Sequence, residues 1–220
     1  TGDPLHKRGY RPVSNEAPIR ETLAAAMADI ARVKEYHRVI DPFCGSGTIL
    51  IESAMKALNI APGLRRHFTA EQWGWIPAAV WKETRGKAEA EQKTGEEFIA
   101  QGYDIDPKAV SLTLENARRA GLEKFIRASV RDISDFKLPT DEKKNLIITN
   151  PPYGERLLDV QQAEQLYRVM GQVFEKRQGA GYYIISSHEQ FKYFFGRKAD
   201  NTKPMFNGKI RCKLFMYFRW

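Results

Sequence analysis

Two short motifs hold the residues best suited to chemistry. The first, Asp41–Thr48, reads Asp-Pro-Phe-Cys-Gly-Ser-Gly-Thr, and the second, much later in the chain, is Asn150-Pro151-Pro152-Tyr153. A carboxylate followed by a glycine turn suits a nucleoside-bearing cofactor, whereas an amide held beside two prolines and an aromatic ring suits an amino group on a base. Together, in this order, the two motifs predict methyl transfer to a nucleic acid.

The glycine turn favours a cationic cofactor. Gly45 and Gly47 allow the backbone and the following helix N-terminus to approach a ligand closely. The spacing Asp-x-x-x-Gly-x-Gly differs from the dinucleotide fingerprint, and no Gly-Lys-Ser/Thr follows, so a P-loop fits poorly. Asp41 would repel phosphate but suits the amino and sulfonium groups of S-adenosylmethionine (SAM), directly or through water and backbone amides. We also expect SAM contacts from Phe43, Ser46, Thr48 and Asn150.

Further polar residues follow the other expected strands. In an open alternating sheet, ligands bind beyond the carboxyl ends of the strands. Asp104 is placed to accept hydrogen bonds from the ribose hydroxyls, Ile105 to stack on adenine, and Asp132 to accept from the adenine 6-amino group. Asp106 stands directly before Pro107, which favours helix capping over ligand binding.

The Asn-Pro-Pro-Tyr motif supplies what transfer to an exocyclic amine needs. The Asn150 side-chain oxygen and the Pro151 carbonyl are acceptors for the two amine hydrogens. Pro151 and Pro152 stiffen the loop, and Tyr153 offers a ring on which a base can stack. Holding the reactants in a near-attack arrangement can supply on the order of 7 to 11 kcal/mol. We therefore expect these four residues to act without a metal, a strong base or a covalent intermediate.

Alternating strand and helix patterns must position these motifs. Apolar runs predict strands near 39–41, 98–104, 125–130, 145–150 and 182–186, and helical spacing predicts helices near 48–58, 106–121 and 161–176. A first helix with Ser14 or Asn15 as its cap and Pro18 in its first turn precedes them. Near the end, Asn207-Gly208 lies between apolar runs and indicates a hairpin. The predicted fold is α/β, with a mostly parallel sheet and an antiparallel C-terminal hairpin strand.

A long insert interrupts this alternation at residues 59–95. It begins irregularly, carries several tryptophans and arginines, and ends in a polar helix that runs to about Thr94. Segments of this kind are either lids and binding surfaces or padding over the sheet. We expect the tryptophans, Trp73, Trp75 and Trp81, to pack and the arginines, Arg65 and Arg66, to lie at the surface.

The composition fits one catalytic domain without metal. The chain has 220 residues, 42% of them hydrophobic, which is enough for one sizeable core. It has no apolar run of the roughly 18 residues that a membrane span requires, and no signal-peptide pattern, so we expect no membrane association and a cytoplasmic location. The two cysteines and four histidines are scattered, so no metal site is expected.

The charge favours a polyanionic partner. The net charge is +8 and the isoelectric point is near 9.4. From Gly179 to Trp220 eight basic residues stand against two acidic ones, with aromatic residues between them. This pattern is compatible both with a solvated face over a strand core and with contacts to phosphates.

The motifs as they stand resemble a known family. Asp41–Thr48, Gly102–Pro107, which reads Gly-Tyr-Asp-Ile-Asp-Pro, and Asn150–Arg156, which reads Asn-Pro-Pro-Tyr-Gly-Glu-Arg, are similar to those of the class I SAM-dependent RNA methyltransferases that modify the 2-amino group of guanine. The resemblance is greatest to the bacterial enzymes that act on large-subunit (23S) ribosomal RNA. It extends to Leu5–Arg11, the insert's Ala61-Pro62-Gly63, and Phe206-Asn207-Gly208, so it spans nearly the whole chain.

This resemblance implies a Rossmann-like class I methyltransferase fold with a seven-stranded sheet. It implies that residues 1–220 are the catalytic domain, that 1–15 form a linker from an N-terminal RNA-binding THUMP domain outside this chain, and that 59–95 are a family insert. The implied SAM residues are Asp41, Gly45, Gly47, Asp104 and Asp132, and the implied base-holding residues are Asn150, Pro151 and Tyr153. Glu155 and Arg156 belong to the pattern without an assigned role.

Three alternatives remain open from the sequence. Enzymes with the same motif act on transfer RNA guanine or on DNA adenine-N6. A third possibility, from another class, is a SAM-binding nucleic-acid module that does not catalyse, although the presence of both Asn150 and Tyr153 argues against it.

Overall fold

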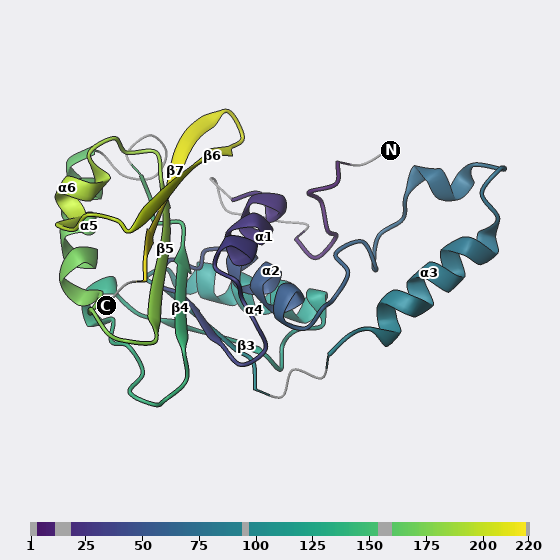
Figure 1. The fold of residues 1–220 in the computed structure, drawn as a ribbon, viewed down its shortest axis with the longest axis horizontal. Coiled ribbons are helices and arrows are strands. Elements are labelled where there is room, and N and C mark those ends of the chain that lie inside the picture. Colours follow the sequence, from purple (N-terminus) through teal and green to yellow (C-terminus); the bar gives the residue numbers. More distant parts are fainter. Residues whose placement is uncertain (1–3, 12–18, 94–96, 154–159, 219–220) are drawn as a thin grey trace.

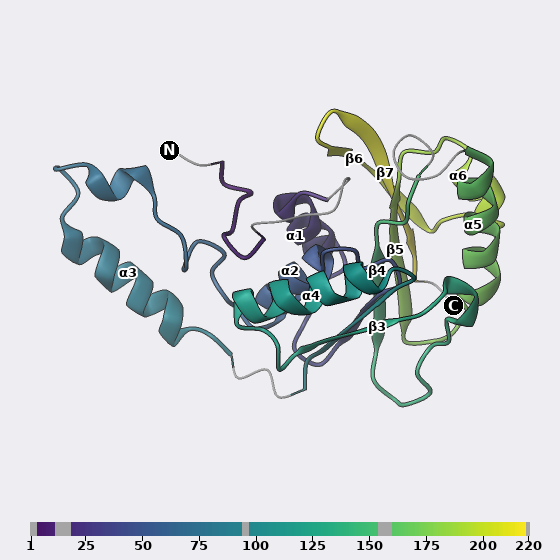
Figure 2. The same cartoon turned by 180° about the vertical axis from the view of Figure 1, so that it is seen from behind.

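A computed structural model describes residues 4–11, 19–93, 97–153 and 160–218 of the protein. These residues form one mixed sheet with helices on both of its faces, and an arm that extends away from the sheet (Figures 1 and 2). The strands are β1 (Arg38–Asp41), β2 (Ile99–Asp104), β3 (Ile126–Val130), β4 (Asn145–Thr149), β5 (Ala180–Ser186), β6 (Asn201–Asn207) and β7 (Ile210–Tyr217). The α-helices are α1 (Glu21–Ile30), α2 (Thr48–Ala57), α3 (Ala78–Ala90), α4 (Pro107–Ala120), α5 (Val160–Val173) and α6 (Phe191–Phe195). Two short 3-10 helices are η1 (Thr69–Gln72) and η2 (Ile133–Asp135).

The strand order of the sheet is β3-β2-β1-β4-β5-β7-β6. Strands β1 to β5 pair in parallel, and β7 runs antiparallel to both of its neighbours, β5 and β6. This confirms the predicted α/β fold, which is the Rossmann-like class I methyltransferase fold, with its seven strands and its C-terminal antiparallel strand. The order reverses between β1 and β4, the point at which such sheets bind ligands.

Local sequence explains why the elements begin and end where they do. All four residues of β1 are buried, as expected for a central strand covered on both faces. The backbone nitrogen of Lys108 donates a 2.8 Å hydrogen bond to the Asp106 side chain, and Pro107 occupies the first turn, which confirms the predicted cap of α4. That helix ends at Gly121, whose φ of 70° is the left-handed conformation typical of a C-cap.

The core has two parts, one on each face of the sheet. Helices α1, α2 and α4 cover one face, with Met27, Leu50 and Ala117 among the buried residues. Helices α5 and α6 cover the other face, where Tyr167 and Phe191 are fully buried. Alternate residues of one strand therefore belong to different parts of the core. In β4, for example, Ile147 belongs to the second and Ile148 to the first.

The insert forms the arm that extends from the sheet in Figure 1. Its helix α3 runs from Ala78 to Ala90, so it ends before the predicted Thr94, and none of its residues is buried. The expectation that the tryptophans pack is wrong for Trp73 and Trp75, which are 42% and 75% exposed and stack on each other. The expectation for the arginines is wrong for Arg66, which is buried. The arm leaves the core, so Trp73 and Trp75 belong to neither part of it. Arg66 lies at the base of the arm, where it donates to the carbonyls of Pro4 and Lys7.

The first helix starts later than the sequence pattern suggested. Helix α1 begins at Glu21 with Arg20 at its N-cap position, and the Arg20 side chain makes no capping hydrogen bond. The proposed caps Ser14 and Asn15, and Pro18, lie outside the described residues. Within the described ranges, no helix is both long and apolar enough to cross a membrane.

Candidate active site

The two motifs meet at one edge of the sheet. Strands β1 and β4 are parallel neighbours, with Ile40 opposite Ile147, so their carboxyl ends lie side by side. The hydroxyl of Thr149, the last residue of β4, donates a 2.7 Å hydrogen bond to Oδ1 of Asp41, the last residue of β1. Because Asn150 follows Thr149 directly, the glycine turn and the Asn-Pro-Pro-Tyr motif are adjacent at the point where the strand order reverses.

The end of β2 is tied to the glycine turn. The backbone nitrogen of Gly45 donates a 2.9 Å hydrogen bond to Oδ2 of Asp104, and that of Cys44 donates to the carbonyl of Tyr103 at 2.9 Å. The other oxygen of Asp104 accepts from the backbone nitrogen of Asp106 at 3.1 Å. These contacts fix the carboxylate of Asp104 beside the turn. Each of its oxygens retains a second lone pair for a ligand hydroxyl.

Helix α4 packs against the turn and explains why glycine stands at position 47. Gly47 has a φ of 78°, and a Cβ atom there would lie 2.9 Å from Cγ2 of Thr113. The Thr113 hydroxyl donates to the carbonyl of Gly45 and the Asn116 side chain donates to the carbonyl of Ser46, both at 2.9 Å. The turn is therefore held from behind by α4, and its shape is set before any ligand binds.

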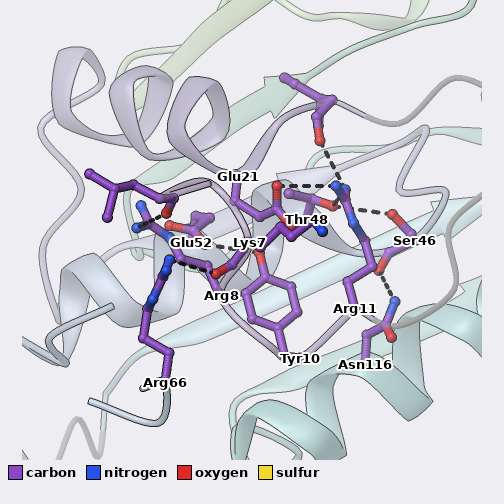
Figure 3. Close-up of polar contacts among 12 residues, drawn as sticks. Lys7, Arg8, Tyr10, Arg11, Glu21, Ser46, Thr48, Glu52, Arg66 and Asn116 are labelled. Atoms are coloured by element: carbon purple, nitrogen blue, oxygen red, sulfur yellow. Dashed lines mark hydrogen bonds and ion pairs between the residues drawn. The ribbon is translucent and has the colours of Figure 1, made fainter. Parts of the chain in front are cut away.

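The hydroxyls of Ser46 and Thr48 are engaged within the protein (Figure 3). They lie 3.1 Å apart, and both residues are buried. Arg11 donates from Nη1 to the Thr48 hydroxyl at 2.8 Å and to the carbonyl of Ile19 at 2.9 Å. Its Nη2 also forms a 3.1 Å ion pair with Glu21. The side chains of Ser46 and Thr48 thus link the turn to Arg11.

Arg11 belongs to a strap, residues 4–11, whose side chains Tyr10 and Arg11 contact Glu52 and Thr48 of α2 (Figure 3). The Tyr10 hydroxyl donates a 2.8 Å hydrogen bond to the buried Glu52 of α2, and Nε of Arg8 lies 3.6 Å from the same carboxyl. Arg66, at the base of the arm, donates to the carbonyls of Pro4 and Lys7 at 3.2 and 3.0 Å. Sequence reasoning gave Arg11 no role, because no spacing rule connects it to a turn that lies far along the chain.

Burial controls the charge of Asp41. The residue is 1% exposed, and burial raises the pKa of its carboxyl to about 7, although the hydrogen bonds from Thr149 and from the Phe43 backbone act in the opposite direction. Glu52 behaves similarly, since burial raises its pKa to about 7 against the pull of Arg8. Asp41 is therefore poised to change its charge near neutral pH.

The residues predicted for adenine lie at the same edge. Ile105 is 68% exposed directly after β2. Oδ1 of Asp132 accepts hydrogen bonds from the backbone nitrogen and the hydroxyl of Ser134 at 2.8 and 2.6 Å, and those bonds lower the pKa of Asp132. Because β3 neighbours β2, Ile105 and Asp132 follow adjacent strand ends. Phe43 is partly buried against the core on the α5 side of the sheet.

The Asn-Pro-Pro-Tyr motif contains a buried acceptor that has no donor in the described part of the chain. Among the described residues, no donor satisfies Oδ1 of Asn150 although this atom is buried. Pro151 is buried and Pro152 is half-buried. The hydroxyl of Tyr153, a residue that is 5% exposed, accepts a 3.0 Å hydrogen bond from the side chain of Asn207 in the C-terminal hairpin. Glu155 and Arg156 lie outside the described residues.

An orphaned buried amide oxygen costs on the order of 1 to 3 kcal/mol, which a ligand donor would recover. The surrounding residues fit a SAM-type cofactor. A fixed glycine turn lies beside a helix N-terminus, Asp104 is fixed beside that turn, and an exposed aliphatic residue, Ile105, follows it. Within the described parts of the chain, no group of three metal-binding side chains is present.

Comparison with known proteins agrees with this geometry. The family described as "RMKL-like, methyltransferase domain" matches residues 8–215. "Putative RNA methyltransferase YpsC" of Bacillus subtilis (strain 168) is 40% identical over 218 residues, which are 99% of this chain and 56% of that protein. "Ribosomal RNA large subunit methyltransferase K/L" of Shewanella frigidimarina (strain NCIMB 400) is 39% identical over 224 residues, which are 99% of this chain and 31% of that protein.

A solved structure supports the same assignment. The crystal structure of SMU.472 complexed with SAH superposes with a TM-score of 0.91 and 37% sequence identity, covering 99% of this chain and 56% of the other. The present chain thus spans about half the length of SMU.472 and YpsC, and about a third of the Shewanella protein. With a family match over residues 8–215 and the class I strand order, the chain belongs to the RMKL-like methyltransferase domain family.

Proposed function

We propose that this domain binds SAM over the glycine turn and transfers its methyl group to the 2-amino group of a guanine in RNA, with 23S ribosomal RNA as the substrate. The observation that carries the proposal is the buried Oδ1 of Asn150, to which none of the described residues donates a hydrogen bond. It lies one residue from Thr149, which is hydrogen-bonded to Asp41 beside the turn. An acceptor in this place, next to a cofactor turn, is what an exocyclic amine requires.

Each predicted SAM residue has a distinct role in the proposal. Asp104 accepts from the ribose hydroxyls, as its fixed position beside Gly45 allows. Ile105 and Asp132 contact the adenine ring and its amino group. The backbone from Phe43 to Thr48 faces the methionyl part, and Asp41 provides the negative charge that a cationic ligand prefers. The glycine turn and the N-terminus of α2 complete the site.

The base is held by the Asn-Pro-Pro-Tyr motif. The amine donates two hydrogen bonds, one to Oδ1 of Asn150 and the other to the carbonyl oxygen of Pro151. Tyr153 stacks on the guanine ring, and its bond to Asn207 fixes the hydroxyl end of its side chain. SAM, when bound, supplies the activated methyl group. What these residues add is alignment of the amine, which can contribute on the order of 7 to 11 kcal/mol.

Several observations support RNA as the substrate. Two relatives that match nearly the whole chain are named as RNA methyltransferases, one of them for large-subunit ribosomal RNA. The net charge of +8 suits a polyanion. Transfer RNA guanine-N2 and DNA adenine-N6 are the alternative targets, and a non-catalytic SAM-binding module is the alternative of another class. We also propose that the whole protein is cytoplasmic and carries an RNA-binding THUMP domain ahead of this one.

Nucleoside analysis of a deletion strain tests the proposal. Ribosomal RNA from cells lacking the gene should lose one N2-methylguanosine, detected by mass spectrometry of digested nucleosides. Loss of N2-methylguanosine from transfer RNA alone would move the substrate to that class. Loss of N6-methyladenine from DNA, or no change in any nucleoside, would contradict the proposal.

A further inference from the structure

The C-terminal hairpin extends past the strand that supports it. The last residue of β5, Ser186, pairs with Lys213, and residues 210–212 of β7 pair only with β6. The hairpin tip, defined here as residues 206–213, therefore projects beyond the carboxyl edge of the sheet, as seen for β6 and β7 in Figure 1. This is the edge that carries the candidate active site.

The two faces of the tip differ. On one face, the side chain of Asn207 is buried and donates to the Tyr153 hydroxyl at 3.0 Å. On the opposite face, Phe206 lies across from Arg211, and Pro204 lies across from Lys213. Arg211 and Lys213 are exposed, and Phe206 is 63% exposed. One face of the hairpin tip thus contacts Tyr153, the residue proposed to stack on the base. The opposite face presents an aromatic ring and two cations to solvent.

The charge of this segment has a single sign. Residues 201–218 contain Lys203, Lys209, Arg211 and Lys213 and no acidic residue. A further cation, the exposed Arg20 at the N-cap of α1, lies near the tip, because its Nη2 would lie 3.8 Å from a Cβ atom at Gly208. Cations interleaved with an exposed aromatic side chain are the composition that single-stranded nucleic acid binds, through phosphates and base stacking.

Protection of an edge strand explains only part of this pattern. Strand β6 is the edge of the sheet, and Lys203 and Pro204 are residue types that prevent edge-to-edge pairing. Arg211 and Lys213, however, lie on β7, which has β6 beside it. An exposed phenylalanine also works against edge protection, because it adds an apolar surface where another chain could dock.

We propose that the outer face of the hairpin tip, formed by Phe206, Arg211 and Lys213, binds the single-stranded RNA that flanks the target guanine. This inference rests on the proposed RNA substrate. Arg211 and Lys213 contact phosphates, and Phe206 stacks on a base next to the one held at Tyr153. The hydrogen bond from Asn207 to Tyr153 holds this surface at a fixed position relative to the candidate active site. The surface selects RNA whose target nucleotide lies in an unpaired segment, because only unstacked bases can reach both rings.

The test compares two double variants with equal charge changes. Arg211→Ala/Lys213→Ala removes the two cations of the outer face of the tip, whereas Lys124→Ala/Lys144→Ala removes two exposed cations that precede β3 and β4, at the amino ends of the parallel strands. Binding of a fluorescein-labelled single-stranded RNA is measured by anisotropy over a range of salt concentrations. The slope of log affinity against log salt is negative, and the tip variant should make it less steep by about 1.4, the value for two lost phosphate contacts on a single strand. The control variant should keep the wild-type slope.

Phe206 provides an independent readout. Phe206→Ala should weaken RNA binding roughly tenfold through the loss of one stacked base, and Phe206→Trp should restore it. Equal RNA affinity of the tip and control double variants, no RNA binding by the wild-type chain, or tighter binding of single-stranded DNA of the same sequence would overturn the inference. Methyl transfer at saturating RNA is measured separately, so that failure of the surface and failure of the proposed reaction are distinguishable.

Discussion

The hydroxyl of Thr149 donates a 2.7 Å hydrogen bond to Oδ1 of Asp41, and this bond joins the two motifs that the proposed reaction needs. Thr149 precedes the amide that would hold the base, and Asp41 precedes the turn that would hold the cofactor. Because both residues end parallel neighbouring strands, the sheet itself sets the separation of cofactor and base.

Replacement of Asn150 should separate chemistry from cofactor binding. Asn150→Ala removes the buried acceptor for the amine, so kcat should fall by about 100-fold or more, while the Kd for SAM, measured by calorimetry, should stay nearly unchanged. Asn201→Ala, in the exposed outer strand, is a matched control and should keep the wild-type kcat. A wild-type rate in Asn150→Ala would contradict the assigned role.

Asp104 and Asp106 should differ although they lie two residues apart. Asp104→Ala removes the proposed ribose acceptor, so SAM affinity should fall about 10- to 100-fold, the range for hydrogen bonds to a charged group. Asp106→Ala removes only the cap of α4 and should cost about 1 kcal/mol of unfolding free energy with little change in SAM affinity. Calorimetry and urea denaturation check the pair, and unaltered SAM affinity in Asp104→Ala would argue against the ribose role.

SAM affinity should rise with pH. The pKa of Asp41 is about 7, so its carboxyl becomes ionised between about pH 6 and 8, and the ionised form favours a cationic ligand. The Kd for SAM should therefore fall over this range in the wild type, and Asp41→Asn should flatten the dependence. Glu52→Gln changes another buried carboxyl with a pKa of about 7 but lies in the strap contacts, so it should leave the dependence intact. A Kd for the wild type that rises with pH would refute this role of Asp41.

The free energy of unfolding should fall as the pH rises, whereas SAM affinity should increase. Burial raises the pKa of Asp41 from 3.8 to about 7, so the folded state holds this proton more tightly than the unfolded state does. The associated stability is fully present below about pH 4 and is lost as the pH rises through about 7, with a steepest loss of about 1.4 kcal/mol of unfolding free energy per pH unit. Urea midpoints should show that Asp41→Asn loses less stability than the wild type between about pH 4 and pH 8. An equal loss in the two proteins would mean that Asp41 does not hold the proton.

Arg11 should support both the fold and the glycine turn. Its side chain and that of Glu21 are 9% and 4% exposed, so Arg11→Met leaves a buried carboxylate unpaired and should cost about 3 to 5 kcal/mol of unfolding free energy. Arg11→Met/Glu21→Leu should recover much of that stability. The double variant should still bind SAM more weakly than the wild type, because it lacks the bond to the Thr48 hydroxyl. Wild-type SAM affinity in the double variant would show that Arg11 acts on the fold alone.

The sequence predicted the sheet well because its signals are local. Apolar runs that end in Asp41, Asp104 and Asn150 marked the strand ends, and Asp106-Pro107 marked a helix start. In a parallel sheet these ends must share one edge, so the sequence also placed the candidate site.

Contacts between distant segments could not be predicted in this way. The bonds from Arg11 to Thr48 and from Asn207 to Tyr153 depend on how the strap and the hairpin pack against the finished sheet. The exposure of Trp75 had no local signal either, because tryptophan is apolar whether or not a core lies beside it. Short helix α6 was not predicted for a related reason. Its phenylalanines pack in the second part of the core, and the sequence carries no local signal for that contact.

Label transfer tests the central claim most directly. The chain is incubated with SAM carrying an isotopically labelled methyl group and with ribosomal RNA from a strain that lacks the gene, and the RNA is then digested to nucleosides. The label should appear in N2-methylguanosine with the wild-type chain and be nearly absent with Asn150→Ala. Label in another nucleoside, or equal labelling by the two proteins, would contradict a guanine amine held by Asn150 beside the cofactor turn.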